Sequence, residues 1–142
     1  MALLKKLFGK DRPSAEEQQE ETDQLVRQLA EARRLLFAVE RRRAEFILEE
    51  DAPMQLSLEE DRLHNRIAEL ENRCIALGVE PVEDALARKE HLTDLLAKAR
   101  ENLLFIQEEV RERGTDVPMQ LAKAEQRWRN RIAKLENELD EG

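Results

Sequence analysis

The chain has no tyrosine, one cysteine and one tryptophan, and only 4 glycines and 4 prolines among its 142 residues. A β-sheet protein needs more turn residues and more β-branched and aromatic residues than this. The single thiol cannot form a disulfide within the chain, so a reducing cytoplasm is the expected compartment. The sequence also lacks zinc-binding spacings, a glycine-rich phosphate loop and a nucleophile elbow. We therefore expect no catalytic, cofactor-binding or metal-binding residues, and the chain is not expected to be an enzyme.

Long apolar runs are also missing, because none approaches the roughly 20 residues that a membrane-spanning helix requires. The apolar run at the N-terminus is too short for a secretory signal. The net charge of −8 argues against nucleic acid as a partner, since binding to phosphates requires a dominant basic face. Two basic clusters, Arg41–Arg43 and Arg127–Arg131, have acidic neighbours that dilute them. The composition thus predicts a cytoplasmic protein, attached at most to a membrane surface, with no nucleic acid and no small-molecule substrate.

Charged residues, in contrast, make up 39% of the chain, and leucine, alanine and isoleucine supply most of its apolar residues. This mixture is typical of long helices and coiled coils. We expect an all-α fold of two tandem antiparallel helical hairpins, in a coiled-coil-like four-helix arrangement. Two forms of it stay open, a compact bundle and an elongated pair of hairpins.

An internal repeat defines this organisation. The segment that begins at Pro53 recurs from Pro118, and 13 of the 20 positions from Pro53 to Asn72 are identical in the second copy. Proline has no amide hydrogen and suits the first helical turn, so each of these prolines is expected to begin the second helix of a hairpin. Ser14 and Glu17 form a capping box for the first helix, which we expect to run to about Leu48. The predicted division is a short cationic amphipathic segment (1–10), a polar linker and helix start (11–23), a first hairpin (24–77), a linker (78–82) and a second hairpin (83–140).

Apolar residues recur at alternating steps of four and three in all four predicted helices, which is the heptad pattern of a coiled-coil seam. In the first and third helices the seam is predicted at Leu25, Leu29, Ala32, Leu36, Val39 and Phe46, and at Leu92, Leu96, Ala99, Leu103, Ile106 and Val110. In the second and fourth helices it is predicted at Leu56, Leu63, Ile67, Leu70, Cys74 and Leu77, and at Leu121, Trp128, Ile132, Leu135 and Leu139.

Charged residues interrupt these seams at matching places. Arg43 and Glu60 lie equally far from the first turn, so we predict that they form an ion pair that fixes the register of the hairpin. The second hairpin keeps Glu125 but has Val110 in place of Arg43, which leaves Arg111 or Arg113 as the expected partner of Glu125. An alternative stays open, in which Glu60 and Glu125 lie in a frayed first turn and face solvent.

The two histidines and the cysteine suggest no chemistry. Asp61 and His64 have the spacing of half a di-metal motif, but the second repeat has Arg129 at the position of His64, and His91 stands alone. His64 is therefore expected to be a solvated surface residue. Cys74 falls on the seam, where a free thiol acts as a small apolar residue.

The first ten residues differ from the rest of the chain because they are cationic and amphipathic. One side of a short helix would carry Leu3, Leu4, Leu7 and Phe8, with Lys5 and Lys6 close by. Such a segment is suited to a groove on a protein, in this chain or another, or to an anionic membrane surface. Docking to protein is the preferred interpretation.

The pattern of a leucine-rich helix, a proline at the start of the next helix and a terminal R-I-A-x-L-E, present twice, resembles a helical-hairpin module of bacterial signalling proteins. That module stands beside NTPase, TIR and caspase-like effector domains, and the resemblance covers Leu25 to Asn72 and Leu92 to Asn137. It implies an adaptor or assembly module. A second resemblance, confined to Leu7–Lys10 and the long hairpin after it, is to ESCRT-III and PspA-like membrane-remodelling proteins.

These observations together favour a non-enzymatic scaffold or adaptor that forms homo-oligomers and recruits a protein partner. Narrow seams with few aromatic residues favour self-association, because dimerisation buries additional apolar surface. The alternative is a peripheral membrane protein, or a membrane-remodelling protein, anchored by its N-terminal segment.

Overall fold

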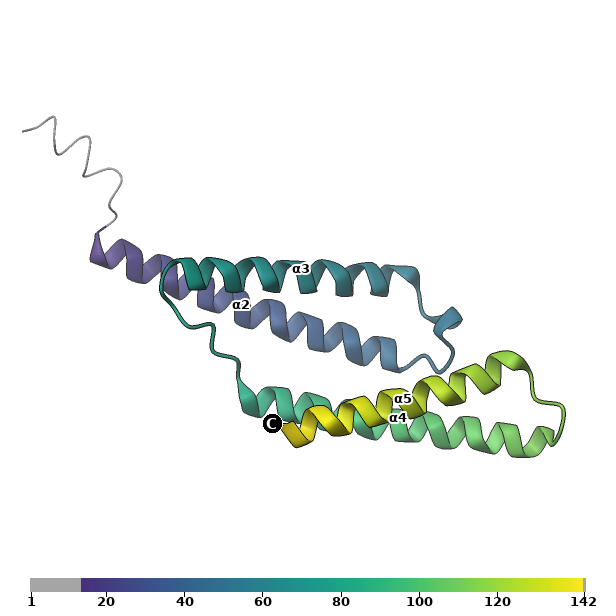
Figure 1. The fold of residues 1–142 in the computed structure, drawn as a ribbon. Coiled ribbons are helices and arrows are strands. Elements are labelled where there is room, and N and C mark those ends of the chain that lie inside the picture. Colours follow the sequence, from purple (N-terminus) through teal and green to yellow (C-terminus); the bar gives the residue numbers. More distant parts are fainter. Residues whose placement is uncertain (1–13, 142) are drawn as a thin grey trace, which may run out of the picture.

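A computed structural model describes residues 14–141 of the chain, and this part is all-α (Figure 1). Its four long helices are α2 (Ala15–Ala44), α3 (Met54–Ala76), α4 (Ala85–Arg113) and α5 (Met119–Glu141). A single 3-10 turn, η1 (Glu49–Asp51), lies between α2 and α3. The predicted fold class is confirmed, because α2 packs against α3 and α4 against α5 as two antiparallel hairpins.

The two hairpins lie side by side and make contact mainly through α2 and α4 (Figure 1). These two helices run in the same direction but are staggered along their length. The start of α2 projects beyond the second hairpin at one end, and the bend between α4 and α5 projects beyond the first hairpin at the other. Of the two forms left open by the sequence, the elongated pair of hairpins describes the structure.

Local signals in the sequence explain where the helices begin. The Ser14 hydroxyl accepts a hydrogen bond from the backbone N–H of Glu17 at 3.2 Å and caps α2, as the sequence predicts. Asp84 caps α4 in the same way, with one carboxylate oxygen accepting the N–H groups of Leu86 and Ala87. Pro53 and Pro118 stand directly before α3 and α5. Proline has no N–H to leave unpaired at that point.

The first helix ends earlier than predicted, at Ala44 and not near Leu48. The N–H groups of Glu45 and Phe46 bond to the carbonyls of Arg42 and Arg43, which tightens the last turn into a 3-10 form and ends the α-helix. The connection to α3 therefore spans residues 45–53. It is longer than the expected four-residue loop, and the second hairpin supplies its additional contacts.

Buried apolar side chains form two separate clusters. One lies within the first hairpin and consists of Leu25, Leu29, Ala32, Leu70 and Cys74. The other lies in the second hairpin and includes Ala44 from the end of α2, together with Leu92, Leu95, Leu96, Ala99, Ile106, Ala124, Trp128 and Leu135. The core is thus divided, and the larger of the two clusters lies in the second hairpin.

The predicted seam residues of α3 and α5 line the insides of the hairpins. Five of them are buried, namely Leu56, Leu70, Cys74, Trp128 and Leu135. Five others are partly buried, namely Leu63, Ile67, Leu121, Ile132 and Leu139. The prediction for Leu77 is wrong. Its side chain is 45% exposed, because α3 ends at Ala76 and Leu77 already belongs to the turn.

One ion pair occurs at the same place in both hairpins. Arg33 contacts Glu71 at 3.1 Å in the first, and Arg100 contacts Glu136 at 3.2 Å in the second. Arg33 precedes Arg100 by 67 positions, whereas the second helices repeat at 65, as Glu71 and Glu136 do. The two hairpins are therefore equivalent in their side-chain contacts as well as in their sequence. Residues of α2 correspond to residues of α4 at a separation of 67 positions, and residues of α3 correspond to residues of α5 at a separation of 65.

Within residues 14–141, no helix is both long and apolar enough to cross a membrane. The predicted docking segment, Leu3, Leu4, Lys5, Lys6, Leu7 and Phe8, lies outside the described residues.

Candidate functional site at the hairpin junction

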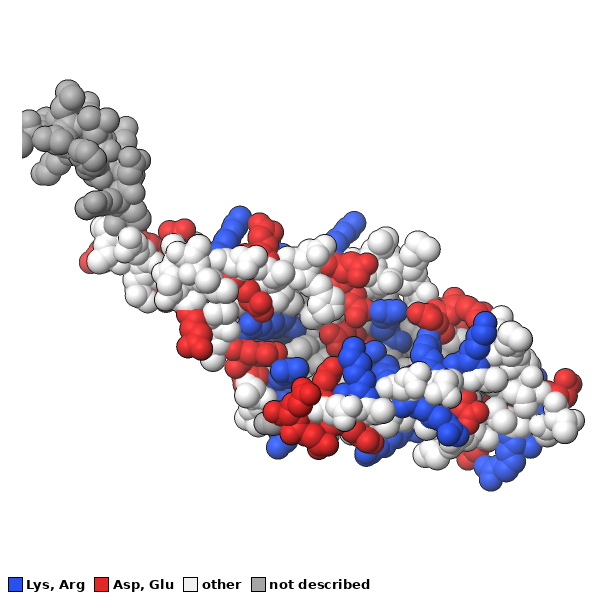
Figure 2. All heavy atoms as spheres, viewed as in Figure 1, with Lys and Arg blue, Asp and Glu red and all other residues white. Residues whose placement is uncertain are grey.

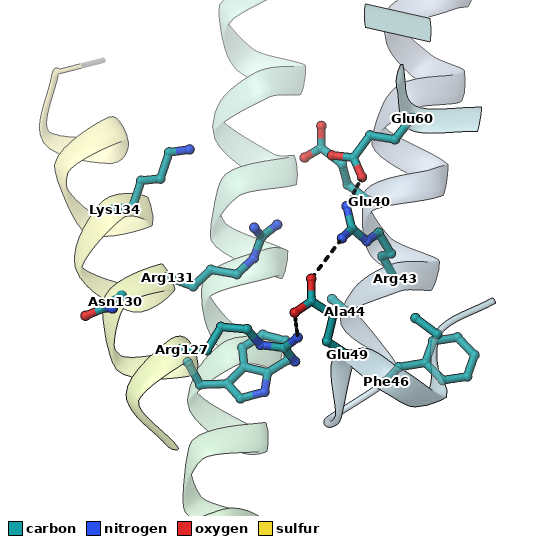
Figure 3. A pocket seen from close by; sticks show the side chains of 12 residues that line it. Glu40, Arg43, Ala44, Phe46, Glu49, Glu60, Arg127, Asn130, Arg131 and Lys134 are labelled. Carbon is teal, nitrogen blue, oxygen red and sulfur yellow. Dashed lines mark hydrogen bonds and ion pairs between the residues drawn. The ribbon is translucent and has the colours of Figure 1, made fainter. Parts of the chain in front are cut away.

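The bend of the first hairpin rests on the second hairpin, and an open pocket of about 270 Å³ lies where they meet (Figure 3). In the figure, Arg127 and Arg131 extend from α5 toward the first hairpin, while Glu40 and Arg43 face them from α2. The pocket is lined by Glu40, Arg43, Ala44, Phe46, Glu49, Ala52, Glu60, Arg127, Trp128, Asn130, Arg131 and Lys134.

A chain of ion pairs crosses this junction. The Arg43 guanidinium donates to the Glu60 carboxylate, which is the pair that the sequence predicts, and it also lies 3.7 Å from a carboxylate oxygen of Glu49. A carboxylate oxygen of Glu49 in turn lies 3.4 Å from the Arg127 guanidinium of α5, so one carboxylate connects the two hairpins. The Glu60 side chain is only 19% exposed. The interpretation of Glu60 as a solvated, frayed residue is therefore wrong.

The expected partners of Glu125 are also wrong. Glu125 contacts Arg129, one turn further along α5, at 2.7 Å. Arg111 and Arg113 are exposed on α4, where Arg113 lies 4.0 Å from Glu109. Because the seam position across from Glu125 holds the apolar Val110, an arginine within α5 is the nearer cation. Within the described residues, the charged positions that interrupt the seams pair across the first hairpin only, whereas the Arg100–Glu136 pair of the second hairpin flanks its seam.

Trp128 attaches the first bend to the second hairpin. Its side chain is 3% exposed, and its indole N–H donates to the Ile47 carbonyl at 2.8 Å. Arg127 donates to the same carbonyl at 2.7 Å, and its guanidinium lies 5.3 Å from the centroid of the indole ring. These bonds satisfy a backbone carbonyl that the early end of α2 leaves outside the helix.

Two buried polar residues of α4 complete the contact, and the sequence did not reveal either of them. His91 is 2% exposed, stacks on Phe37 with ring centroids 4.0 Å apart, and bonds through Nε2 to Glu40 at 3.1 Å. Asn102 is 3% exposed and donates to the Ala44 carbonyl at 2.7 Å. Both lie off the heptad seam. An apolar pattern does not indicate polar residues on the flank of a helix.

The surroundings of the other two candidates, His64 and Cys74, suggest no chemical role for either. His64 is 57% exposed, as expected. Ligand atoms of Glu40, Glu60 and His64 lie within 4.8 Å of one another. However, the Arg43 guanidinium already neutralises Glu60, and Glu40 is bonded to His91, so we propose no metal site there. Cys74 is a buried free thiol in the apolar cluster of the first hairpin.

The surface around the junction carries both signs of charge in alternation (Figure 2). The fold brings together the two basic clusters of the sequence, since Arg43 and Arg127 both face Glu49. The positive charges of Arg43 and Arg127 are thus balanced within the molecule. Among the described residues, no buried polar side-chain atom lacks a hydrogen-bond partner. The arrangement is suited to holding two hairpins in a fixed orientation.

We predict a measurable coupling between Arg43 and Glu60 in a double-mutant cycle. Removing either charge alone (Arg43→Met or Glu60→Gln) leaves its partner half-buried without its nearest counter-charge, so the two losses of unfolding free energy should not add. The expected coupling energy is about 1 kcal/mol, because both groups retain some contact with water. Urea denaturation of the two single variants and the double variant measures it. Additive losses would show that Arg43 and Glu60 stabilise the hairpin independently.

No family model matches the chain, and neither the curated proteins nor the solved structures that we compared with it show a significant similarity.

Proposed function

We propose that this protein is a non-enzymatic scaffold or adaptor that self-associates and recruits a protein partner. The partner is recruited through the outer surfaces of the hairpins and through the N-terminal segment. The proposal rests on the described residues of the two hairpins and on the composition of the chain. The resemblance to an adaptor hairpin of bacterial signalling proteins agrees with it.

The observation that carries the proposal is the number of large apolar side chains that remain exposed on these narrow hairpins. Single exposed apolar residues are ordinary, but repeated ones on a chain with a divided core favour contact with another protein. The exposed side chains are Val26, Leu35, Met54, Leu58, Ile75, Leu77, Val82, Leu86, Leu104, Phe105 and Met119. They lie on both hairpins, so association with another protein would involve helices of both.

The junction supports a role as a rigid spacer. The contacts of Trp128, Asn102 and His91 with the first hairpin are buried or half-buried, and each involves a hydrogen bond. Such contacts hold the outer faces of the two hairpins at a fixed separation. A scaffold needs this property, because its partners must be presented in a defined geometry.

Self-association is tested by light scattering coupled to size-exclusion chromatography across a wide concentration range. We expect the mean mass to rise above that of the 16.6 kDa chain as concentration increases. High salt should change this rise only partly, because apolar contacts contribute to it and are not screened. A mass that stays at one chain under all conditions contradicts the self-association part of the proposal.

The second candidate is a peripheral membrane protein, and the cationic amphipathic sequence of residues 1–10 favours it. Flotation with anionic vesicles compares the full chain with a variant lacking Met1 to Lys10. Under the scaffold proposal neither protein floats. If only the full chain floats, and does not float with neutral vesicles, the segment binds an anionic membrane and this second candidate replaces protein docking.

A further inference from the structure

The contact between α2 and α4 uses two different helix faces. The face that α2 contributes, called here the docking face, includes Phe37, Arg41 and Ala44. The face that α4 contributes, called here the receiving face, includes His91 and Asn102. Phe37 stacks on His91, Arg41 donates to the His91 Nδ1 atom at 3.4 Å, and the Ala44 carbonyl accepts from Asn102.

Each of these faces has a counterpart that is exposed. The first helices of the two repeats correspond at a separation of 67 positions, as the equivalent ion pairs of Arg33 and Arg100 show. The counterpart of the docking face on α4 is therefore Leu104, Glu108 and Arg111, and the counterpart of the receiving face on α2 is Gln24, Arg27, Glu31 and Leu35. All of these residues are exposed, with Leu104 at 62% and Leu35 at 48%.

We propose that a second copy of this chain repeats the internal contact, placing its α2 receiving face against the exposed docking face of α4. The proposal rests on the self-association proposed above and names the surfaces that carry it. Residues Leu104, Glu108 and Arg111 of one copy contact Gln24, Arg27 and Leu35 of the next. The internal contact supplies the geometry for the contact between copies.

The charges on the two exposed faces are complementary, although they differ from those inside the chain. Within the chain, Arg41 and Asp94 line the same groove between α2 and α4. At the equivalent positions between copies, Glu108 meets Arg27, so both signs are reversed and attraction is retained. At this pair of positions an interface between copies therefore keeps an attraction between opposite charges.

The remaining positions of the groove also have workable counterparts. Glu45 and Lys98 line it within the chain, and their equivalents between copies are Glu112 and Glu31. Arg111, the counterpart of Ala44, lies on the same face and supplies the positive charge between these two carboxylates. Leu35 takes the place of Asn102, so the hydrogen bond that Asn102 donates to the Ala44 carbonyl has no side-chain counterpart between copies.

The geometry determines what kind of assembly results. The docking and receiving faces lie on different sides of a helix, so each copy still exposes one free face after it binds another. Such head-to-tail contacts are heterologous, and they continue into a ring or an open chain and do not stop at a two-fold dimer. The stagger of the two hairpins in Figure 1 is passed on from copy to copy.

The test uses charge reversals in the full chain, measured by light scattering and sedimentation velocity. Glu108→Arg places two arginines together at the contact, and Arg27→Glu places two glutamates together. Each variant alone is expected to self-associate about tenfold or more weakly than the unaltered chain, because like charges then face each other. An equimolar mixture of the two variants should regain assembly, since the arginine introduced at position 108 of one variant then meets the glutamate introduced at position 27 of the other.

Matched controls reverse the same signs on α3, where Asp61→Arg and Arg66→Glu alter exposed side chains away from both faces. These controls should assemble like the unaltered chain. If the unaltered chain assembles and the Glu108 and Arg27 variants assemble equally well, this contact is wrong while self-association stands. If the unaltered chain remains monomeric, self-association itself fails. An unaltered chain that stops at a dimer contradicts the head-to-tail geometry.

Discussion

Trp128→Ala is expected to destabilise the protein more than any other truncation to alanine in the described residues. Truncating a buried tryptophan typically costs about 3–5 kcal/mol of unfolding free energy, against a total of roughly 5–15 kcal/mol for a domain. The expected loss is at the upper end, because Trp128 packs in the larger cluster and also donates to the Ile47 carbonyl of the first hairpin. Urea denaturation followed by circular dichroism measures the change.

The first repeat supplies the control for this substitution. Leu63 occupies the position equivalent to Trp128, so Trp128→Leu keeps an apolar side chain that the hairpin seam accepts. We expect this variant to lose about half as much stability as Trp128→Ala, since it gives up the indole N–H and the contact with the bend but retains much of the seam packing. If both variants lose the same unfolding free energy, the hydrogen bond to the Ile47 carbonyl contributes more to stability than the packing of the side chain in the seam. A loss below about 1 kcal/mol for Trp128→Ala would contradict its assignment to the core.

Leu70→Ala is expected to have the largest effect in the first hairpin. Leu70 is 1% exposed and belongs to a cluster of only five buried side chains. Its truncation should cost about 2–5 kcal/mol and leave a cavity that the small cluster cannot fill. Because the two clusters are separate, we expect the loss to appear mainly in the first hairpin. Hydrogen exchange should then accelerate in residues 19–32 and 66–77 and change little in α4 and α5.

Ile75→Ala serves as the matched control, because Ile75 lies on the same helix and is 63% exposed. Its stability should remain within about 0.5 kcal/mol of the unaltered chain. If Leu70→Ala accelerates hydrogen exchange equally in all four helices, the two hairpins unfold as one cooperative unit. The two apolar clusters then do not stabilise the hairpins independently of each other.

The parts of this structure that the sequence revealed are those governed by local or repeating signals. Heptad spacing located the seams, and proline before each second helix located its start. The pairing of Arg43 with Glu60 followed from their equal distance to the turn. Each of these inferences needs only the geometry of one hairpin, which the chain specifies twice.

The contacts between the hairpins could not be inferred in the same way. His91 and Asn102 lie off the seam, and their burial depends on how the second hairpin is placed against the first. The early end of α2 has the same origin, since Arg127 and Trp128 bind the Ile47 carbonyl across some eighty positions of the chain. A periodic pattern in the sequence does not indicate a contact between helix faces that occurs only once within the chain.

The divided core places the single cysteine and the single tryptophan in different hairpins. Cys74 is fully buried in the first cluster, and Trp128 is buried in the second. A thiol reagent therefore reacts only when the first hairpin opens, whereas indole fluorescence follows the second hairpin and its junction. The unaltered chain thus carries one spectroscopic and one chemical reporter, and the opening rates of its two halves can be timed separately without introducing any label site.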